Sequence, residues 1–201
     1  ISYVAKRFDD KHPSLYAIPV DGGESRKVAG HDTGISDYAF SADGKRVAFL
    51  AKSKIDDKIK KAKKQGFNAK VYEEEPRPTG VWTADLESGV VAKGVKATRF
   101  LLEGSASTVA FSPDGRSLAV SIAPTPLIDD YYMKRKVHIL SAETRAIQGK
   151  LETTGKIGRA TYSPNGKQIA MIAGADPNDP AAGRLMVGSS EGGELKAALP
   201  L

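Results

Sequence analysis

The sequence contains three copies of one ten-residue pattern, and the first copy reads Phe40-Ser41-Ala42-Asp43-Gly44-Lys45-Arg46-Val47-Ala48-Phe49. The second copy begins at Phe111 and reads FSPDGRSLAV, and the third begins at Tyr162 and reads YSPNGKQIAM. In each copy a strand-like run ends in an aromatic residue, passes through a polar turn and continues into a second apolar run. The pattern therefore predicts a β-hairpin at each of the three places.

The turn residues support the same interpretation. Proline suits the first corner because its φ is already fixed, and Asp or Asn forms hydrogen bonds to the local backbone. Glycine takes the positive φ that closes the hairpin. In the first copy Ala42 stands where the other two copies have proline, which keeps the geometry but loses some rigidity.

A second hairpin is expected after each copy, for example at Val137-His138-Ile139-Leu140 before Ala142-Glu143-Thr144. Two hairpins per unit make a four-stranded antiparallel sheet, and recurring sheets of this kind are typical of β-propeller blades. The predicted fold is all-β, a β-propeller of about four blades. The expected blades are 1–30 (incomplete), 35–95 with an insertion at 52–79, 107–151 and 157–199.

The first expected blade lacks its innermost strand. A ring of four blades would be unusually small, and a propeller closes so that no sheet edge is left open. We therefore expect these residues to form part of a larger propeller.

The insertion explains both the spacing of the repeats and the charge of the chain. The first two copies lie 71 residues apart and the last two 51. Residues 52–70 hold eight lysines and two aspartates, whereas the other 22 basic and 22 acidic residues of the 201 cancel, so this segment carries the whole net charge of +6. It predicts one short helix over 53–66, capped by Ser53 and ended by Gly66, with Ile55, Ile59 and Ala62 as a thin apolar stripe.

The composition excludes several classes of site. There is no cysteine, which excludes disulfides and thiolate sites, and the three histidines (His12, His31 and His138) leave little material for a metal cluster. No apolar run approaches a membrane span, and no stacking platform or groove-reading motif accompanies the lysines. We expect no metal, no cofactor, no membrane span and no specific nucleic-acid partner. Non-specific phosphate binding through residues 52–70 stays open as an alternative.

One segment, Gly188-Ser189-Ser190-Glu191-Gly192, matches the nucleophile elbow Gly-x-Ser-x-Gly. In an α/β-hydrolase an acid and then a histidine follow the serine, but the last histidine is His138. A hairpin turn explains the segment better. Each histidine is read as a loop or packing residue, so no catalytic residue is predicted in this chain.

The three turn motifs resemble TolB-like propeller repeats. Among proteins with such repeats, one group shows a narrower resemblance. The segment from Lys63 to Arg77, followed by Val81-Trp82-Thr83, is similar to an insertion in prolyl-oligopeptidase-type serine peptidases, in the acylaminoacyl-peptidase and dipeptidyl-aminopeptidase branch. In that family the propeller is non-catalytic, covers a separate C-terminal α/β-hydrolase domain and restricts access to peptides.

The resemblance also implies a candidate substrate site. Dipeptidyl-peptidases of this family carry a Tyr-Glu-Glu-Glu stretch whose glutamate pair binds the free amino group of the substrate. The matching residues here are Tyr72-Glu73-Glu74-Glu75, which makes Glu74 and Glu75 the candidate substrate-binding pair. The alternative is an acidic loop that pairs with the lysines before it.

The expected function is therefore that of a propeller which gates peptide access to a hydrolase domain absent from this chain. Its expected partners are that domain and peptide substrates, and an oligomer is possible. The alternative is a stand-alone TolB-like protein-interaction propeller.

Overall fold

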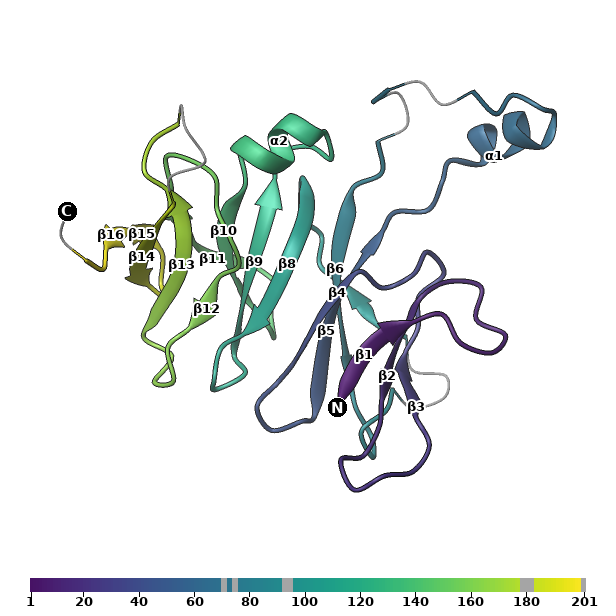
Figure 1. Ribbon diagram of the computed structural model, residues 1–201, viewed down its shortest axis with the longest axis horizontal. Helices are drawn as coiled ribbons and strands as arrows, with labels where there is room; N and C mark the ends of the chain where they lie inside the picture. The colour runs from purple at the N-terminus through teal and green to yellow at the C-terminus, as the bar shows by residue number, and fades with distance from the viewer. Residues whose placement is uncertain (70–71, 74–75, 92–95, 178–182, 200–201) are drawn as a thin grey trace.

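The computed structural model describes residues 1–69, 72–73, 76–91, 96–177 and 183–199. Four antiparallel sheets stand side by side in an arc, with the first and last sheets at its two ends (Figure 1). The fold is an all-β propeller fragment, as the repeats predicted.

Each sheet takes its strands in chain order, with one exception. The first sheet is β1 (Ser2–Ala5), β2 (Ser14–Ala17) and β3 (Arg26–Ala29), and the second is β4 (Asp37–Phe40), β5 (Arg46–Lys52), β6 (Thr79–Asp85) and β7 (Thr98–Arg99). The third contains β8 (Ser105–Phe111), β9 (Ser117–Ala123), β10 (Lys136–Ser141) and β11 (Ile147–Glu152). The fourth contains β12 (Thr161–Tyr162), β13 (Gln168–Gly174), β14 (Gly183–Ser189) and β16 (Lys196–Ala197). The exception is β15 (Gly193–Glu194), which leaves the fourth sheet and pairs in parallel with β11 of the third.

The central strands of the second and third sheets are apolar on both faces because each of these two sheets packs between two others. On β5 the side chains of Val47 and Phe49 join the core shared with the first sheet. Those of Ala48 and Leu50, which alternate with them, join the core shared with the third sheet. A third core, which includes Ile139, Leu151 and Ile169, lies between the third and fourth sheets. An unbroken apolar run is what a strand buried on both faces requires.

The three repeated turns have one structure. In the first, the Ser41 hydroxyl donates to Asp43 Oδ1 (2.6 Å) and the Arg46 amide donates back to Ser41 Oγ (2.9 Å). The same two bonds recur at Ser112 and Ser163. The turn glycines have φ of +68°, +70° and +72°, as predicted (Gly44, Gly115 and Gly166).

The outer strand of the second sheet differs from the expectation. The second blade was expected to end at residue 95, but residues 92–95 lie outside the described residues, and Val90 forms an isolated bridge with Glu87. The strand that pairs with β6 is β7, where Arg99 faces Trp82.

Two helices lie at one edge of the arc, opposite the repeated turns (Figure 1). They are α1 (Asp57–Lys64), inside the insertion, and α2 (Ile128–Met133), between β9 and β10. We call this edge the insertion face and the edge with the repeated turns the turn face. Helix α1 confirms the predicted inserted helix, but its N-cap is Asp56 and not Ser53, because Asp56 Oδ1 accepts the Lys58 amide hydrogen (2.7 Å). Ser53 instead donates its hydroxyl to the Pro78 carbonyl (2.9 Å).

Candidate functional site: a groove on the insertion face

The insertion begins and ends at one pair of facing residues in the second sheet. Lys52, the last residue of β5, is paired with Thr79, the first residue of β6. Beyond this pair, the amide and the hydroxyl of Ser53 both donate to the Pro78 carbonyl, at 2.8 and 2.9 Å. These bonds fix the two ends of the insertion at the top of the sheet.

A groove of about 700 Å³ lies between the insertion and α2. Its floor contains residues from the starts of the inner strands, Ser36 before β4 and Ser105 to Ser107 on β8. One wall is the insertion and the other is the segment that leads into α2. The lining of the walls includes Lys52, Ile55, Glu73, Arg77, Leu127 and Tyr131. The volume falls in the range typical of ligand sites.

The α2 wall is fixed by a buried carboxylate. Asp130 is 8% exposed, accepts the Thr125 hydroxyl (2.7 Å) and pairs with Lys134 (2.8 Å). Both partners lower the pKa of Asp130, the Lys134 ammonium most. Two adjacent aspartates between strands, such as Asp129 and Asp130, are ordinarily expected to be solvated, but Asp130 is buried.

Arg135 stabilises the groove from behind. Its guanidinium lies over the Tyr131 ring, 4.3 Å from the centroid, and donates to Ser107 Oγ (3.2 Å) and to the Ile157 carbonyl (2.7 Å). One side chain thus connects α2, the inner strand of the third sheet and the segment before the fourth. The arrangement gives the groove a positioned floor and wall.

The candidate pair Glu74 and Glu75 lies outside the described residues, so its role stays a prediction. The two residues before the pair are described, and both line the groove. Glu73 has a positive φ of 60°, and its Oε1 accepts the Ile128 amide hydrogen at 3.3 Å. Partial desolvation, followed by the nearby carboxylates of Glu73 and Asp129, raises the pKa of the Tyr72 hydroxyl. The Tyr72-Glu73 stretch therefore contacts the opposite wall of the groove.

The α2 wall was missed at the sequence level. Its signal is the length of the connection between the second copy of the repeated pattern, which ends at Val120, and the hairpin that begins at Val137. This connection is too long for a hairpin turn and rich in Pro, Leu, Ile and Tyr. Periodicity gave no helix over so few residues, because six residues complete less than two turns.

The segment that matches a nucleophile elbow is a turn, as predicted. Ser190 follows β14, and its amide donates to the Lys167 carbonyl (3.1 Å). Gly192 then lets the chain approach β11: a Cβ there would lie 2.8 Å from the Lys150 nitrogen. The glycines of the motif thus serve the contact between the third and fourth sheets.

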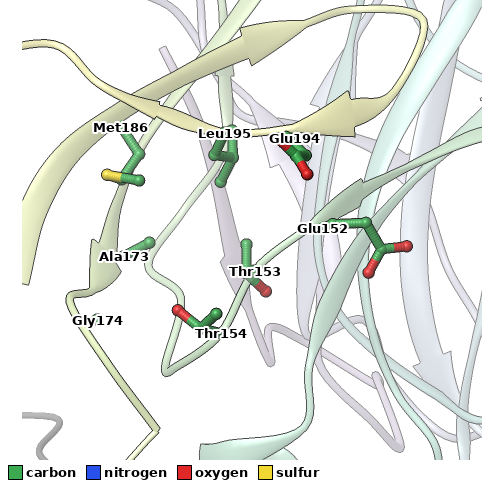
Figure 2. Close-up of a pocket in the computed structure, with 8 residues that line it drawn as sticks. All are labelled: Glu152, Thr153, Thr154, Ala173, Gly174, Met186, Glu194 and Leu195. Carbon is green, nitrogen blue, oxygen red and sulfur yellow. The ribbon is translucent and has the colours of Figure 1, made fainter.

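A smaller cavity of about 300 Å³ lies beside this contact (Figure 2). Met186, Ala173 and Leu195 form apolar walls, and the Glu152 carboxylate points away from Met186 and Ala173 in Figure 2. That carboxylate instead pairs with Lys150 (3.0 Å). The cavity is therefore a gap in the packing between the third and fourth sheets.

Two histidines are part of the packing, in line with the sequence. His31 lies against Trp82, with ring centroids 4.6 Å apart, and burial lowers its pKa. His138 lies on β10, where burial also lowers its pKa. Within the described residues, no group of three or more acidic, histidine or cysteine side chains could hold a metal ion. In the same part of the chain, no helix is both long and apolar enough to cross a membrane.

Solved structures show the same fold. The chain is similar to TolB from Acinetobacter baumannii (TM-score 0.59, 16% identity, 99% of this chain and 40% of that one) and to a putative TolB from Agrobacterium tumefaciens (0.62, 16%, 98% and 59%). It is also similar to the β-propeller domain of the Trilobed protease from Pyrococcus furiosus (0.58, 14%, 98% and 53%). The chain thus spans between two fifths and three fifths of the length of these proteins. No protein-family model and no curated protein matches the sequence significantly.

The class of protein follows from the four sheets, the repeated turns and these similarities. The chain has a TolB-like β-propeller fold. One of the similar structures is the propeller domain of a protease.

Proposed function

We propose that this chain is the non-catalytic propeller of a serine peptidase of the acylaminoacyl-peptidase or dipeptidyl-peptidase type. In this role it admits peptides to a separate α/β-hydrolase domain that the chain itself does not contain. The observation that carries the proposal is the groove on the insertion face, which holds Tyr72 and Glu73 of the Tyr-Glu-Glu-Glu stretch. The similarity to a protease propeller supports it.

The chemistry of the described residues agrees with a binding role. The serine of the elbow-like motif sits in a turn, with its amide bonded to the Lys167 carbonyl. His31 and His138 take part in packing, and the Ser-His-Asp arrangement of an α/β-hydrolase needs a histidine base held next to the nucleophile. A groove between two fixed walls can instead orient a peptide and exclude larger molecules.

A second candidate function is a stand-alone interaction propeller that presents its loops to a protein partner. The similarity to two TolB structures over nearly the whole chain favours it. The insertion face would again be the binding surface, since the groove does not depend on a hydrolase domain.

Labelling with a fluorophosphonate probe, which reacts with activated serines, distinguishes the two functions. The full product of the parent gene is expected to be labelled at a serine outside residues 1–201 and to cleave short peptides but not folded proteins. The variant Ser190→Ala is expected to keep full labelling. Absence of any labelled serine, together with recovery of a stable protein partner, would overturn the peptidase proposal in favour of the interaction propeller.

A further inference from the structure

We propose that the groove on the insertion face selects peptides with acidic side chains, which it binds through Lys52 and Arg77. This inference rests on the proposed peptide-binding function and names the substrate class. It assigns to the groove an anion-binding role distinct from recognition of an amino group by Glu74 and Glu75.

The balance of charge inside the groove favours an anionic ligand. Within the described residues, neither the Lys52 ammonium nor the Arg77 guanidinium has a hydrogen bond or an ion pair, although both residues line the groove. The lining carboxylate that the structure describes, Glu73, already accepts the Ile128 amide hydrogen. Two cations therefore face the groove with unused donors.

The geometry of those donors suits carboxylates. A guanidinium presents a planar fork that matches the two oxygens of a carboxylate, and an ammonium adds a point charge with rotatable donors. Arg77 comes from the returning arm of the insertion and Lys52 from the end of β5, so the two approach the groove from different segments. Two acidic side chains of one peptide, or one between them, can be bound in this way.

The surface beside the two cations suits a peptide. Ile55, Leu127 and Tyr131 give apolar contact for a peptide backbone and its aliphatic side chains. Ser36 and Ser107 line the floor, and because their hydroxyls donate to the Leu50 and Ser121 carbonyls (3.4 and 3.3 Å) they offer a peptide acceptors only. Mixed walls of this kind suit an extended peptide better than a free inorganic anion.

The lysine-rich insertion also attracts anionic ligands over a longer range. The segment 52–70 carries a net charge of +6 next to the groove, on a molecule that is otherwise neutral. Such a field raises the local concentration of anionic ligands and speeds their association, and salt screens it. The lysine-rich insertion thus gains a role that its thin apolar stripe does not explain.

The test measures fluorescence anisotropy with two hexapeptides, each with a dye coupled to its N-terminal amine as an amide and with an amidated C-terminus: Gly-Glu-Ala-Glu-Ala-Gly and the same peptide with glutamine for glutamate. Blocked ends remove the terminal charges, so binding cannot depend on recognition of an amino group. We expect the acidic peptide to bind at least about tenfold more tightly than the neutral one. Its affinity should fall between about 50 and 200 mM salt.

The matched variants are K52Q/R77Q in the groove and K45Q/R116Q on the turn face, which each remove two positive charges. The groove variant should weaken binding of the acidic peptide about tenfold, and the control variant less than about twofold. Equal effects of the two variants, or equal binding of the two peptides, would overturn the inference. Retained thermal unfolding temperatures would show that both variants are folded.

Two further arms separate this inference from its alternatives. A single-stranded oligonucleotide that binds more tightly than the acidic peptide, and that K52Q/R77Q also weakens, would assign the groove to nucleic acid and overturn the peptide assignment. A gene product that is labelled by fluorophosphonate but cleaves acidic and neutral peptides equally would overturn the acidic selectivity and leave the proposed peptidase function standing.

Discussion

His31 illustrates how a single side chain connects the loop before β4 to the core of the second sheet. Its ring packs against Trp82, and its Nδ1 lies 2.9 Å from the Thr33 hydroxyl oxygen. The Thr33 hydroxyl donates in turn to the Lys52 carbonyl (2.6 Å), next to the groove. Protonation of the imidazole would therefore place a charge beside an aromatic core.

The lowered pKa values of His31 and His138 predict a stability that depends on pH near neutrality. Burial lowers both pKa values. Above the ordinary histidine pKa the two imidazoles are therefore neutral in the folded and in the unfolded chain, and the chain has its full stability. As the pH falls through about 6.5, the unfolded chain takes up protons that the folded chain refuses, and the free energy of unfolding decreases. Urea unfolding at pH 7.5 and 5.5 should show this loss, and H31Q should reduce it. An unchanged loss in the double variant H31Q/H138Q would contradict the prediction.

Individual residues also mark the limit of prediction from sequence. Ser53 and Asp56 are both good N-cap residues three positions apart, and only the path of the insertion decides between them, because Ser53 is used at Pro78. Asp130 looks like a solvated acid in sequence, yet Thr125 and Lys134 allow its burial. The motif draws attention to the stretch Tyr72 to Glu75, but the contact of Glu73 with Ile128 depends on a helix that no pattern predicted.

At the scale of elements, the hairpins were predictable because all their determinants are local. Ser41, Asp43 and Gly44 form their bonds within six residues, and the same chemistry recurs twice. The strand pair β11–β15 was not predictable, because it joins Leu151 to Gly193 in parallel across two sheets. Nothing in the local pattern of either segment signals that pairing. The two walls of the groove likewise come from segments that more than forty residues of sequence separate.

The β11–β15 contact predicts that Gly149 tolerates no side chain. A Cβ at this position would lie 2.0 Å from the Glu191 carbonyl oxygen, so the strand pair would have to separate. We expect G149A to lower the free energy of unfolding by about 1–3 kcal/mol. Hydrogen exchange should show faster exchange of the amides at residues 193 and 194.

The matched control is G30A. Its Cβ would meet the flexible end of the Lys27 side chain at 2.9 Å and would lie in ordinary contact with the Ser14 hydroxyl at 3.4 Å, so its cost should stay within about 0.5 kcal/mol. If G149A and G30A had the same unfolding midpoint in urea, the close approach of β11 and β15 would not be a constraint on stability.

At the scale of the whole molecule, three sheets meet at the start of β4. Asp37 Oδ2 accepts the Val109 amide hydrogen (3.0 Å), and its Oδ1 pairs with Arg159 (3.1 Å). Arg159 also donates to the Val109 carbonyl (3.2 Å), which completes a set of bonds among the second sheet, the third sheet and the segment before the fourth. The residues span 122 positions of sequence, so only the assembled arc brings them together.

The two members of this ion pair should contribute unequally to stability. Removing Asp37 leaves the Val109 amide without its acceptor beside a buried side chain, so D37A should cost about 1–3 kcal/mol. Arg159 is half exposed, with 53% of its side chain accessible, so R159A should cost less than about 1 kcal/mol. The exposed turn residue Asp21 provides the control, and D21A should change stability by no more than about 0.5 kcal/mol.

A double-mutant cycle measured by urea unfolding tests whether the bonds act together. The two side chains should stabilise each other, with a coupling free energy no larger than about 1 kcal/mol, because the pair is partly solvated. Trp82 lies between the first and second sheets, so its fluorescence reports one end of the arc, whereas far-ultraviolet circular dichroism reports all four sheets. If the sheets unfold as one unit, D37A shifts both signals by the same amount. A shift of the circular dichroism signal alone would show that Asp37 stabilises only the third and fourth sheets.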